Sequence, residues 1–503
     1  MGGGGSGRDE LAEVMARLID PDRGTVNYGE HLLQGLPEAV TGRRISFVDS
    51  APFIFNLTLG DNLFYGLKHR PLKEATYEGD KKKERDSYVV EARASGNLEY
   101  DLAADWVDYG AAGVEDNVGL RRAGIEALKV VGLDEDVYQF GLRGRIDPEK
   151  RSDIAEGVLK VRKALDERLA DPSLAVLIER FDPAAYNSNA SLAENLLFGT
   201  PVGDTFDLDH LAEHPYILEV LEKVGMTDQM VSMGYQAAAT MVELFSDLPP
   251  DHELFQQFSF VSSDDLPELQ GLLAQYTKDQ LDTLKPHERA KLMSLPFKLV
   301  QARHRLGIID DSVKAKILEA RKAFADSLPD DLAGSVAFFD PDHYNAAANI
   351  QDNILFGKIA YGQAQAQDRV GSLMREVMAE LGIIETVSEV GLEFEVGIGG
   401  SRLTGAQRQK LALARAVVKR PDVLILTEAT ASLDTSSQAR ILDGLLADFE
   451  GRSIIWGVHR PAMAERFDHV LVMKGGRIVE SGSFEELSKE GSTLSQLIAA
   501  EAA

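Results

Sequence analysis

The stretch from Gly399 to Asp434, GGSRLTGAQRQKLALARAVVKRPDVLILTEATASLD, decides the fold class predicted for this chain. Its residues 403–407, LTGAQ, form a loop of small residues at the start of a predicted helix over 407–420. Thr404 is placed to cap that helix, with Gln407 three positions on as its reciprocal partner in a capping box. A helix start of this kind presents backbone N–H groups and the positive end of the helix dipole to an anion.

A short buried strand follows the helix. Pro421 ends the helix, and the apolar run Val423-Leu424-Ile425-Leu426 leads into Thr427-Glu428. A carboxylate at the end of a buried strand, facing an anion site, is placed to activate a water molecule. Each piece alone is also typical of an ordinary helix–strand unit, so the interpretation depends on the order and spacing of all of them together.

Five segments occur in the order found in ATP-binding cassette (ABC) proteins. Residues 403–407 resemble the family's LSGGQ signature, and residues 423–428 resemble its Walker B strand. Ser432-Leu433-Asp434 resembles the D-loop, IIWGVHR at 454–460 the strand that carries the switch histidine, and GGRIVESG at 475–482 the closing hairpin.

The N-terminus allows two interpretations. The run GGGGSG at 2–7 is typical of a flexible linker. It also resembles a degenerate Walker A phosphate loop, because residues 17–26 resemble the segment that follows the Walker A helix. In that interpretation Arg8 stands where the family has Lys, and Asp9 stands where it has Ser or Thr for magnesium. The strand that should precede the loop is not in this sequence, which suggests a fragment of a longer polypeptide.

Two further nucleotide-contacting positions are altered. Residues 45–56, ISFVDSAPFIFN, resemble the strand and Q-loop of exporter-type ABC domains, with Ser50 in place of the family's glutamine. Thr427 stands where the Walker B aspartate organises magnesium. The chain therefore resembles an exporter-like, degenerate ABC nucleotide-binding domain.

Internal repeats separate the two halves of this pattern. The motif DNLFYG at 61–66 recurs as ENLLFG at 194–199 and DNILFG at 352–357. Upstream, FDPAAYN at 181–187 matches FDPDHYN at 339–345, and VRKA at 161–164 matches ARKA at 320–323. The constant offset of about 158 residues between the last two copies predicts a duplication. The insertion over 67–345 is predicted to be mostly helical, as a structural or docking appendage.

The composition of the chain argues against several classes of function. The chain has 503 residues, a formal net charge of −28 and no cysteine, so it offers neither disulfides nor thiolate chemistry. An acidic surface repels phosphate backbones, which argues against nucleic-acid binding. No apolar run approaches the roughly 20 residues that a membrane-spanning helix needs.

The resemblance implies an α/β fold, with a RecA-like ABC ATPase core and a greatly enlarged, mostly α-helical subdomain. Residues 1–66 would form the N-terminal part of the core. Residues 67–345 would form the insertion, and residues 346–503 would contribute the signature helix, Walker B, D-loop and switch histidine.

The resemblance also assigns site residues. Glu428 would polarise the attacking water and His459 would touch the γ-phosphate. The nucleotide-binding set is Gly2, Gly5, Ser6, Gly7, Arg8, Asp9, Ser50, Leu403, Thr404, Gly405, Ala406, Gln407 and Asp434. Within it, Gly405 and Gln407 would contact the γ-phosphate held by a partner cassette, and Asp434 would couple the two sites. No metal ligand is assigned.

Three functions fit this pattern. The first is the ATP-binding domain of an exporter-like ABC transporter, at the cytoplasmic face of the cell membrane, with a low-activity site of its own. Its implied partners are a transmembrane domain and a second ABC cassette, and its implied ligands are ATP and, through altered residues, Mg²⁺. The alternatives are a pseudo-ATPase that regulates or scaffolds a complex, and a soluble ABC-type ATPase outside transport. The transported substrate cannot be read from these residues.

Overall fold

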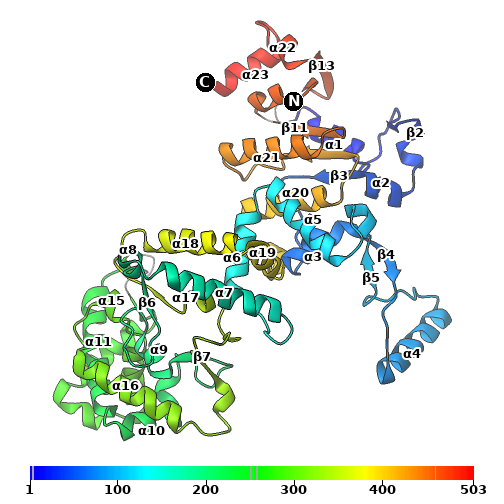
Figure 1. Ribbon diagram of the computed structural model, residues 1–503. Helices are drawn as coiled ribbons and strands as arrows, with labels where there is room; N and C mark the ends of the chain where they lie inside the picture. The colour runs from blue at the N-terminus through cyan, green and yellow to red at the C-terminus, as the bar shows by residue number, and fades with distance from the viewer. Residues whose placement is uncertain (3–4, 250–251, 253, 256–258, 459, 503) are drawn as a thin grey trace. The chain divides into compact units, whose positions relative to one another are not determined.

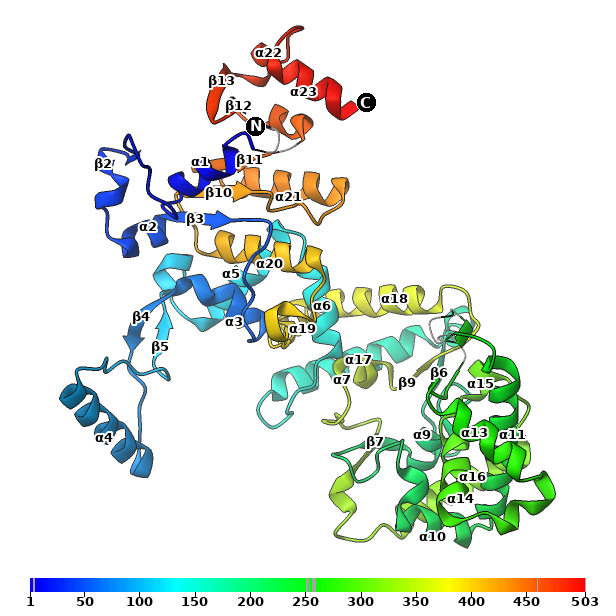
Figure 2. The ribbon, with the colours of Figure 1, turned by 180° about the vertical axis from the view of Figure 1, so that it is seen from behind.

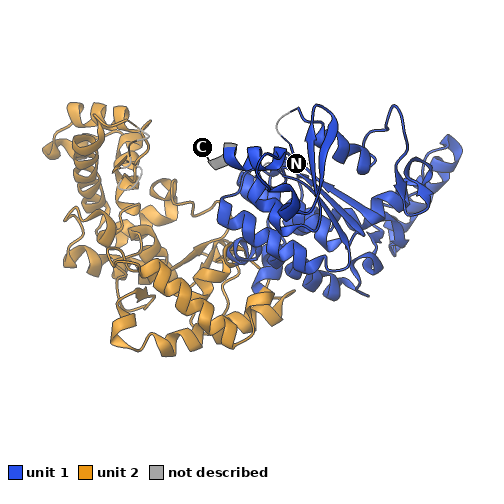
Figure 3. Ribbon diagram, turned by 90° about the horizontal axis from the view of Figure 1, so that it is seen from above, with its two compact units in different colours: residues 1–141, 387–503 blue, residues 142–386 orange. Residues whose placement is uncertain are grey.

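The computed structural model describes residues 1–2, 5–249, 252, 254–255, 259–458 and 460–502. Their contacts divide the chain into two compact units (Figure 3), unit 1 with residues 1–141 and 387–503, and unit 2 with residues 142–386. These limits differ from the positions 66/67 and 345/346 chosen from the sequence. Because compactness does not assign a role to a segment, that domain assignment stays a prediction.

The central sheet of unit 1 joins the two ends of the chain. Its strands are β3 (Ile45–Val48), β10 (Val423–Thr427) and β11 (Ser453–Gly457), in the order β11-β10-β3. All neighbours are parallel, with Val423 opposite Ile45 on one side and Ser453 on the other. The first fifty residues and the last hundred therefore build one sheet, as the sequence predicts (Figure 1).

Helices cover both faces of this sheet. Ile425 packs with Ala12 of α1 (Arg8–Met15) on one face. Its neighbours Leu424 and Leu426 pack on the other face in a cluster with residues of α5 (Asn117–Val130), α20 (Gly405–Val418) and α21 (Thr435–Asp448). Successive residues of a strand point to opposite faces, so this arrangement gives an α/β layered core (Figure 2).

Unit 1 has further elements outside the three-stranded sheet and the helices named above. They are β1 (Asn27–Tyr28), β2 (His31–Leu32), α2 (Glu38–Arg44), α3 (Leu59–Phe64), β4 (Lys68–Lys73), α4 (Gly79–Ser95), β5 (Asp105–Val107), α6 (Asp134–Arg143), α19 (Ile384–Gly391), β12 (Val470–Lys474), β13 (Arg477–Gly482), α22 (Phe484–Leu487) and α23 (Thr493–Ala502). Helices α6 and α19 carry the chain across the boundary between the units.

Unit 2 is mainly helical. Its helices are α7 (Ser152–Arg168), α8 (Pro172–Ala175), α9 (Leu192–Leu197), α10 (Pro215–Lys223), α11 (Thr227–Phe245), α13 (Leu266–Gln275), α14 (Pro286–Phe297), α15 (Gln301–His304), α16 (Asp311–Asp326), α17 (Ile350–Leu355) and α18 (Ala366–Glu380). Its strands β6 (Ile178–Arg180), β7 (Gly199–Pro201), β8 (Val336–Phe338) and β9 (Gly357–Ile359) are three residues each.

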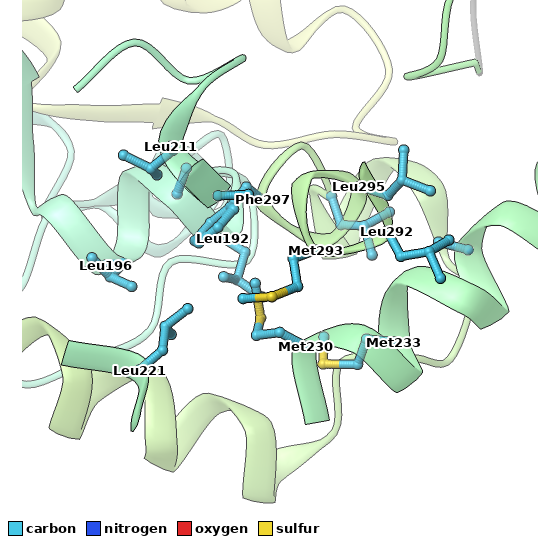
Figure 4. Close-up of a cluster of buried hydrophobic side chains, with 14 of the residues drawn as sticks. Leu192, Leu196, Leu211, Leu221, Met230, Met233, Leu292, Met293, Leu295 and Phe297 are labelled. Atoms are coloured by element: carbon cyan, nitrogen blue, oxygen red, sulfur yellow. The ribbon is translucent and has the colours of Figure 1, made fainter. Parts of the chain in front are cut away.

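A methionine-rich core holds one end of unit 2 together. Met230 and Met233 of α11 lie beside Leu292 and Met293 of α14, and Phe297 is 1% exposed (Figure 4). Methionine fills irregular gaps between helices because its side chain is unbranched and polarizable.

The repeated motifs build the same hydrogen-bonded unit three times. In α16, the buried Arg321 donates from Nε to the carbonyl of Asn195 (2.7 Å) and from a terminal nitrogen to the Asn195 Oδ1 (3.1 Å). Its other terminal nitrogen donates to the carbonyls of residues 182, 183 and 185. The Arg321 guanidinium lies 4.4 Å from the ring centroid of Phe198, and burial lowers the pKa of Arg321 to about 10.

The second and third copies repeat this pattern. Arg162 of α7 donates to the carbonyl (2.7 Å) and Oδ1 (3.3 Å) of Asn353, and Arg415 of α20 donates to the carbonyl (2.8 Å) and Oδ1 (3.0 Å) of Asn62. We call these the three Arg–Asn locks. Their order is nested along the chain, with the pair 195–321 inside 162–353 and both inside 62–415.

The two locks of unit 2 are related as if by a twofold axis. Each arginine binds the asparagine of the other copy. In the same way β6 pairs with β9, and β7 pairs with β8, while the equivalent residues Phe181 and Phe339 stack on each other at 4.0 Å. Exchange of equivalent contacts is the mark of an isologous interface, here formed between two halves of one chain.

Among the helices that the structure describes, none combines the length and the apolar character needed to cross a membrane.

Acid is expected to destabilise unit 2 through His304. Burial lowers the pKa of His304 to about 4, while the unfolded chain keeps a value near 6.5. The unfolded state therefore binds more protons between these values, so the stability present above pH 6.5 is lost as pH falls toward 4. Urea unfolding at pH 7 and pH 4.5 measures the loss. A His304→Gln variant should show a smaller difference between the two pH values, and an unchanged difference would contradict the assignment.

Candidate nucleotide site

The start of α20 has the predicted capping box. Thr404 Oγ1 accepts from the Gln407 backbone N–H at 3.2 Å, and Gln407 Oε1 accepts from the Thr404 N–H at 2.9 Å. The helix begins at Gly405, two residues before the predicted start at 407. Gln407 also donates from Nε2 to Asp136 Oδ1 of α6 at 2.7 Å. The loop at the helix start is thus held by the capping box within α20 and by the hydrogen bond to α6.

The side chains of the signature loop differ in exposure. Leu403 is 4% exposed and belongs to the core of unit 1, with Ala406 packed against the same cluster. Gly405 faces the D-loop, since a Cβ on it would lie 3.5 Å from Ser432 Oγ. A Cβ at this position would thus make an ordinary van der Waals contact with the D-loop.

Arg8 lies at the centre of the N-terminal part of the site. Its Nε and one terminal nitrogen donate to the two carboxylate oxygens of Asp9 at 3.0 Å each, and that terminal nitrogen also donates to Glu428 Oε1 at 3.1 Å. The other terminal nitrogen donates to the carbonyls of Val458 (3.2 Å) and Gly2 (3.4 Å). All five N–H donors of the guanidinium are thereby directed to acceptors of this chain.

Glu428 is placed by the end of β10. Its φ of 50° lies in the left-handed region, which is unusual for a residue with a side chain. Gly457, opposite Thr427 at the end of β11, leaves room for the arginine, because a Cβ there would lie 3.2 Å from Arg8 Cδ. Arg8, which directly follows the glycine run, therefore lies against the end of the strand that leads to Glu428.

The glycine run leads into α1. Gly7 is the N-cap of that helix with φ 86°, and Gly5 has φ 71°. Ser6 is buried, and its carbonyl accepts from the Gly476 N–H of the hairpin β12–β13 at 2.9 Å. A Cβ on Gly2 would lie 2.5 Å from Ser6 Oγ. These contacts tie the loop to the core of unit 1.

Ser50 and Asp434 take part in local contacts. The carbonyl of Ser50 accepts from Gln409 Nε2 at 3.1 Å, and Gln409 Oε1 accepts from the Ser432 N–H at 2.9 Å, linking the Q-loop segment to the D-loop. Asp434 caps α21. Hydrogen bonds from Ser437 and Ser436 lower the pKa of Asp434, so it is a carboxylate at neutral pH.

His459 lies outside the described residues. No cluster of three potential metal-binding side chains occurs among the residues described. Thr427 replaces a carboxylate and is 6% exposed, while Asp9 and Glu428 are both held by Arg8. The residues present do not fit a magnesium ion.

Two contacts of the site were missed by the sequence analysis. Asp136 binds the signature glutamine from 271 positions away in the sequence, and Gly457 makes space for Arg8. A glycine at the end of an apolar strand signals close backbone approach, so Gly457 could have been found. Asp136 is one of several acidic residues in the first turn of α6, and no pattern distinguishes it.

Part of this region matches a family model and segments of known proteins. Residues 312–431 match the family model described as ABC transporter. A 152-residue segment is 41% identical to the ATP-dependent lipid A-core flippase of Burkholderia pseudomallei (strain 1710b), covering 29% of this chain and 25% of the flippase. The flippase of Xanthomonas oryzae pv. oryzae (strain MAFF 311018) is 39% identical over 151 residues, covering 30% and 24%.

One solved structure, a bacterial Atm1-family ABC exporter with ATP bound, shares 34% identity. It covers 22% of this chain and 20% of that chain, with a TM-score of 0.22. The chain thus spans about a quarter of the length of the curated relatives that it matches. Together with the signature and Walker B segments, the family match and the flippase relatives support an exporter-like ABC nucleotide-binding domain within this chain.

Proposed function

We propose that this chain couples ATP binding to membrane transport as the ATP-binding domain of an exporter-like ABC transporter, with a low-activity nucleotide site of its own. The observation that carries the proposal is the well-formed start of α20, where Thr404 and Gln407 cap the helix beside the D-loop. In this proposal the core is RecA-like, and unit 2 belongs to a greatly enlarged helical subdomain.

The proposal includes a second cassette. The signature loop would complete the site of that partner, with Gly405 allowing close approach of backbone N–H groups to a γ-phosphate. Asp434 would transmit the state of one site to the other. The better-preserved signature side and the altered Arg8 side support an asymmetric pair of sites.

A transmembrane domain is the other proposed partner, at the cytoplasmic face of the membrane. The segment after the Q-loop exposes Phe53 (72%), Leu57 (39%) and Tyr65 (43%). The third Arg–Asn lock ties this segment to α20, because Arg415 also donates to the carbonyl of Phe53 at 3.0 Å. Exposed apolar side chains on a segment fastened to the signature helix support a contact that transmits motion.

A pseudo-ATPase with a regulatory or scaffolding role is the second candidate. It is supported by the complete use of the Arg8 donors within the chain, which leaves none for phosphate in this state. Binding of ATP to the purified chain separates the two candidates.

Turnover of ATP by the isolated chain is expected to be slow and to depend on Glu428. Without the family's lysine and magnesium-organising groups, most of the electrostatic stabilisation of phosphoryl transfer is missing. Glu428→Gln should lower the remaining rate by about a hundredfold or more, the size of a lost general base. Phosphate release by the two proteins measures this. Fast magnesium-dependent turnover that survives the substitution would reject the proposed low-activity site.

A further inference from the structure

A guanidinium lies in the site where the family's chemistry needs a metal ion. Arg8 is bound to both Asp9 oxygens and to Glu428 Oε1, so one positive group joins two carboxylates. These are the two acidic side chains of the site that could otherwise bind a divalent cation. Because the same guanidinium contacts both carboxylates, a divalent cation bound between them would have to displace Arg8 from its bidentate pair with Asp9.

The side chains of Arg8, Glu428 and Asp9 differ in solvent exposure. This difference decides which hydrogen bond of Arg8 can be replaced by a bond to a ligand. Arg8 is 5% exposed, Glu428 is 33% exposed and Asp9 is 48% exposed. The backbone carbonyls of Gly2 and Val458 hold the far side of the guanidinium. Arg8 is therefore fixed in place, whereas the half-exposed carboxylate of Asp9 can turn into solvent at small cost.

The freed side of the guanidinium matches a phosphate. Carboxylate and phosphate oxygens accept the same pair of parallel N–H donors, and arginine keeps its charge at any ordinary pH. A phosphate group could thus replace Asp9 on Arg8 while Glu428 stays bound. In that arrangement the positive charge of Arg8 offsets part of the negative charge of the phosphate. Unlike a bound metal ion, this positive group is part of the chain and cannot dissociate.

We propose that Arg8 is the resident cation of this site, and that the site takes a nucleoside triphosphate without a divalent metal. The proposal rests on the ATP binding that the proposed function includes. It explains why the carboxylates of Asp9 and Glu428 are joined by one arginine, since a site without a metal has its positive charge in that guanidinium.

The test compares nucleotide affinity with and without magnesium. A fluorescent ATP analogue is titrated into the full chain in excess EDTA and in excess Mg²⁺, and Mn²⁺ uptake is followed by electron paramagnetic resonance. The affinities in the two buffers are expected to agree within twofold, with no Mn²⁺ bound together with the nucleotide. The double variant Arg8→Lys/Asp9→Ser removes the fork and frees Glu428, and should bind the analogue at least tenfold more tightly in Mg²⁺ than in EDTA.

Arg44→Lys is the matched control. Arg44 forms an exposed ion pair with Asp422 at 3.0 Å in the same unit, so the change is of the same kind but away from the site. It should leave both affinities unchanged. Asp9→Ser alone, at a half-exposed position, guards against a double variant that does not fold. Because it keeps Arg8 on Glu428 and removes only the carboxylate that competes with phosphate, it should bind the analogue more tightly than the unchanged chain, equally in both buffers and without Mn²⁺.

Each other outcome has a defined meaning. Binding by the unchanged chain that is tenfold tighter in Mg²⁺ overturns the inference and strengthens the proposed function. Indifference to magnesium in a folded Arg8→Lys/Asp9→Ser variant overturns the role of Arg8 alone. Absence of binding in both buffers overturns the inference together with the ATP-binding function, and leaves the pseudo-ATPase candidate.

Discussion

Replacing Arg321 with methionine is expected to destabilise unit 2 by about 3 kcal/mol or more, the usual cost of breaking a buried charged hydrogen-bond network. The substitution would leave the carbonyls of residues 182, 183, 185 and 195 without their donor, in a place where Arg321 is 6% exposed. Methionine keeps much of the apolar length against Phe198, so the loss reports mainly on the polar contacts.

The matched controls lie in the same unit. Arg162→Met breaks the equivalent lock and should cost a similar amount, whereas Arg180→Met removes an exposed ion pair with Asp166 at 2.9 Å and should cost less than about 1 kcal/mol. Hydrogen exchange of peptides from α9 and α17 measures the local free energy of opening in each protein. If Arg321→Met and Arg180→Met lowered the local free energy of opening by equal amounts, this would contradict the structural role of the locks.

Adding one methyl group at Gly234 is the second large expected effect. A Cβ on Gly234 of α11 would lie 2.0 Å from the carbonyl oxygen of Leu292 in α14. Since backbone atoms cannot turn aside as a side chain can, the two helices would have to separate and open the methionine-rich core. Gly234→Ala should therefore cost about 2 kcal/mol or more, in the range of overpacked cores.

Gly271→Ala provides the opposite case. This glycine lies inside α13 of the same unit and has open space around the position of a Cβ. Alanine is the better helix former, so the change should be neutral or stabilise by about 0.5–1 kcal/mol. Urea unfolding of both variants gives the comparison. A Gly234→Ala variant as stable as Gly271→Ala would show that α11 and α14 do not pack as closely as described.

Much of the core was predictable because its signals are local. The apolar run at 423–426 gave the strand, and the spacing of Thr404 and Gln407 gave the capping box that the structure contains. The predicted helix start was late by two residues, because Gly405 already takes helical geometry directly after its cap. The duplication was also visible, since both copies keep the same spacing.

The partners of the repeated residues were not predictable. A repeat gives similar copies but does not say whether Arg321 binds Asn195 or Asn353, since the sequences around the two asparagines are alike. That choice depends on the tertiary arrangement of the two copies. In unit 2 each lock joins an arginine of one copy to an asparagine of the other. Likewise the position of Arg8 predicted a contact with phosphate, while its actual acceptors include a residue 420 positions away.

The nested order of the locks has a consequence for how the protein is made. A ribosome that synthesises this chain completes the pair 195–321 first, then 162–353, and only then the pair 62–415. The chain leaves unit 1 after Gly141 and returns at Val387, where the two backbones touch. Domains usually fold in order from the N-terminus. Here residues 1–141 must wait, with strand β3 still without its partner β10, until the last hundred residues emerge, so nascent unit 1 depends on prompt folding of unit 2.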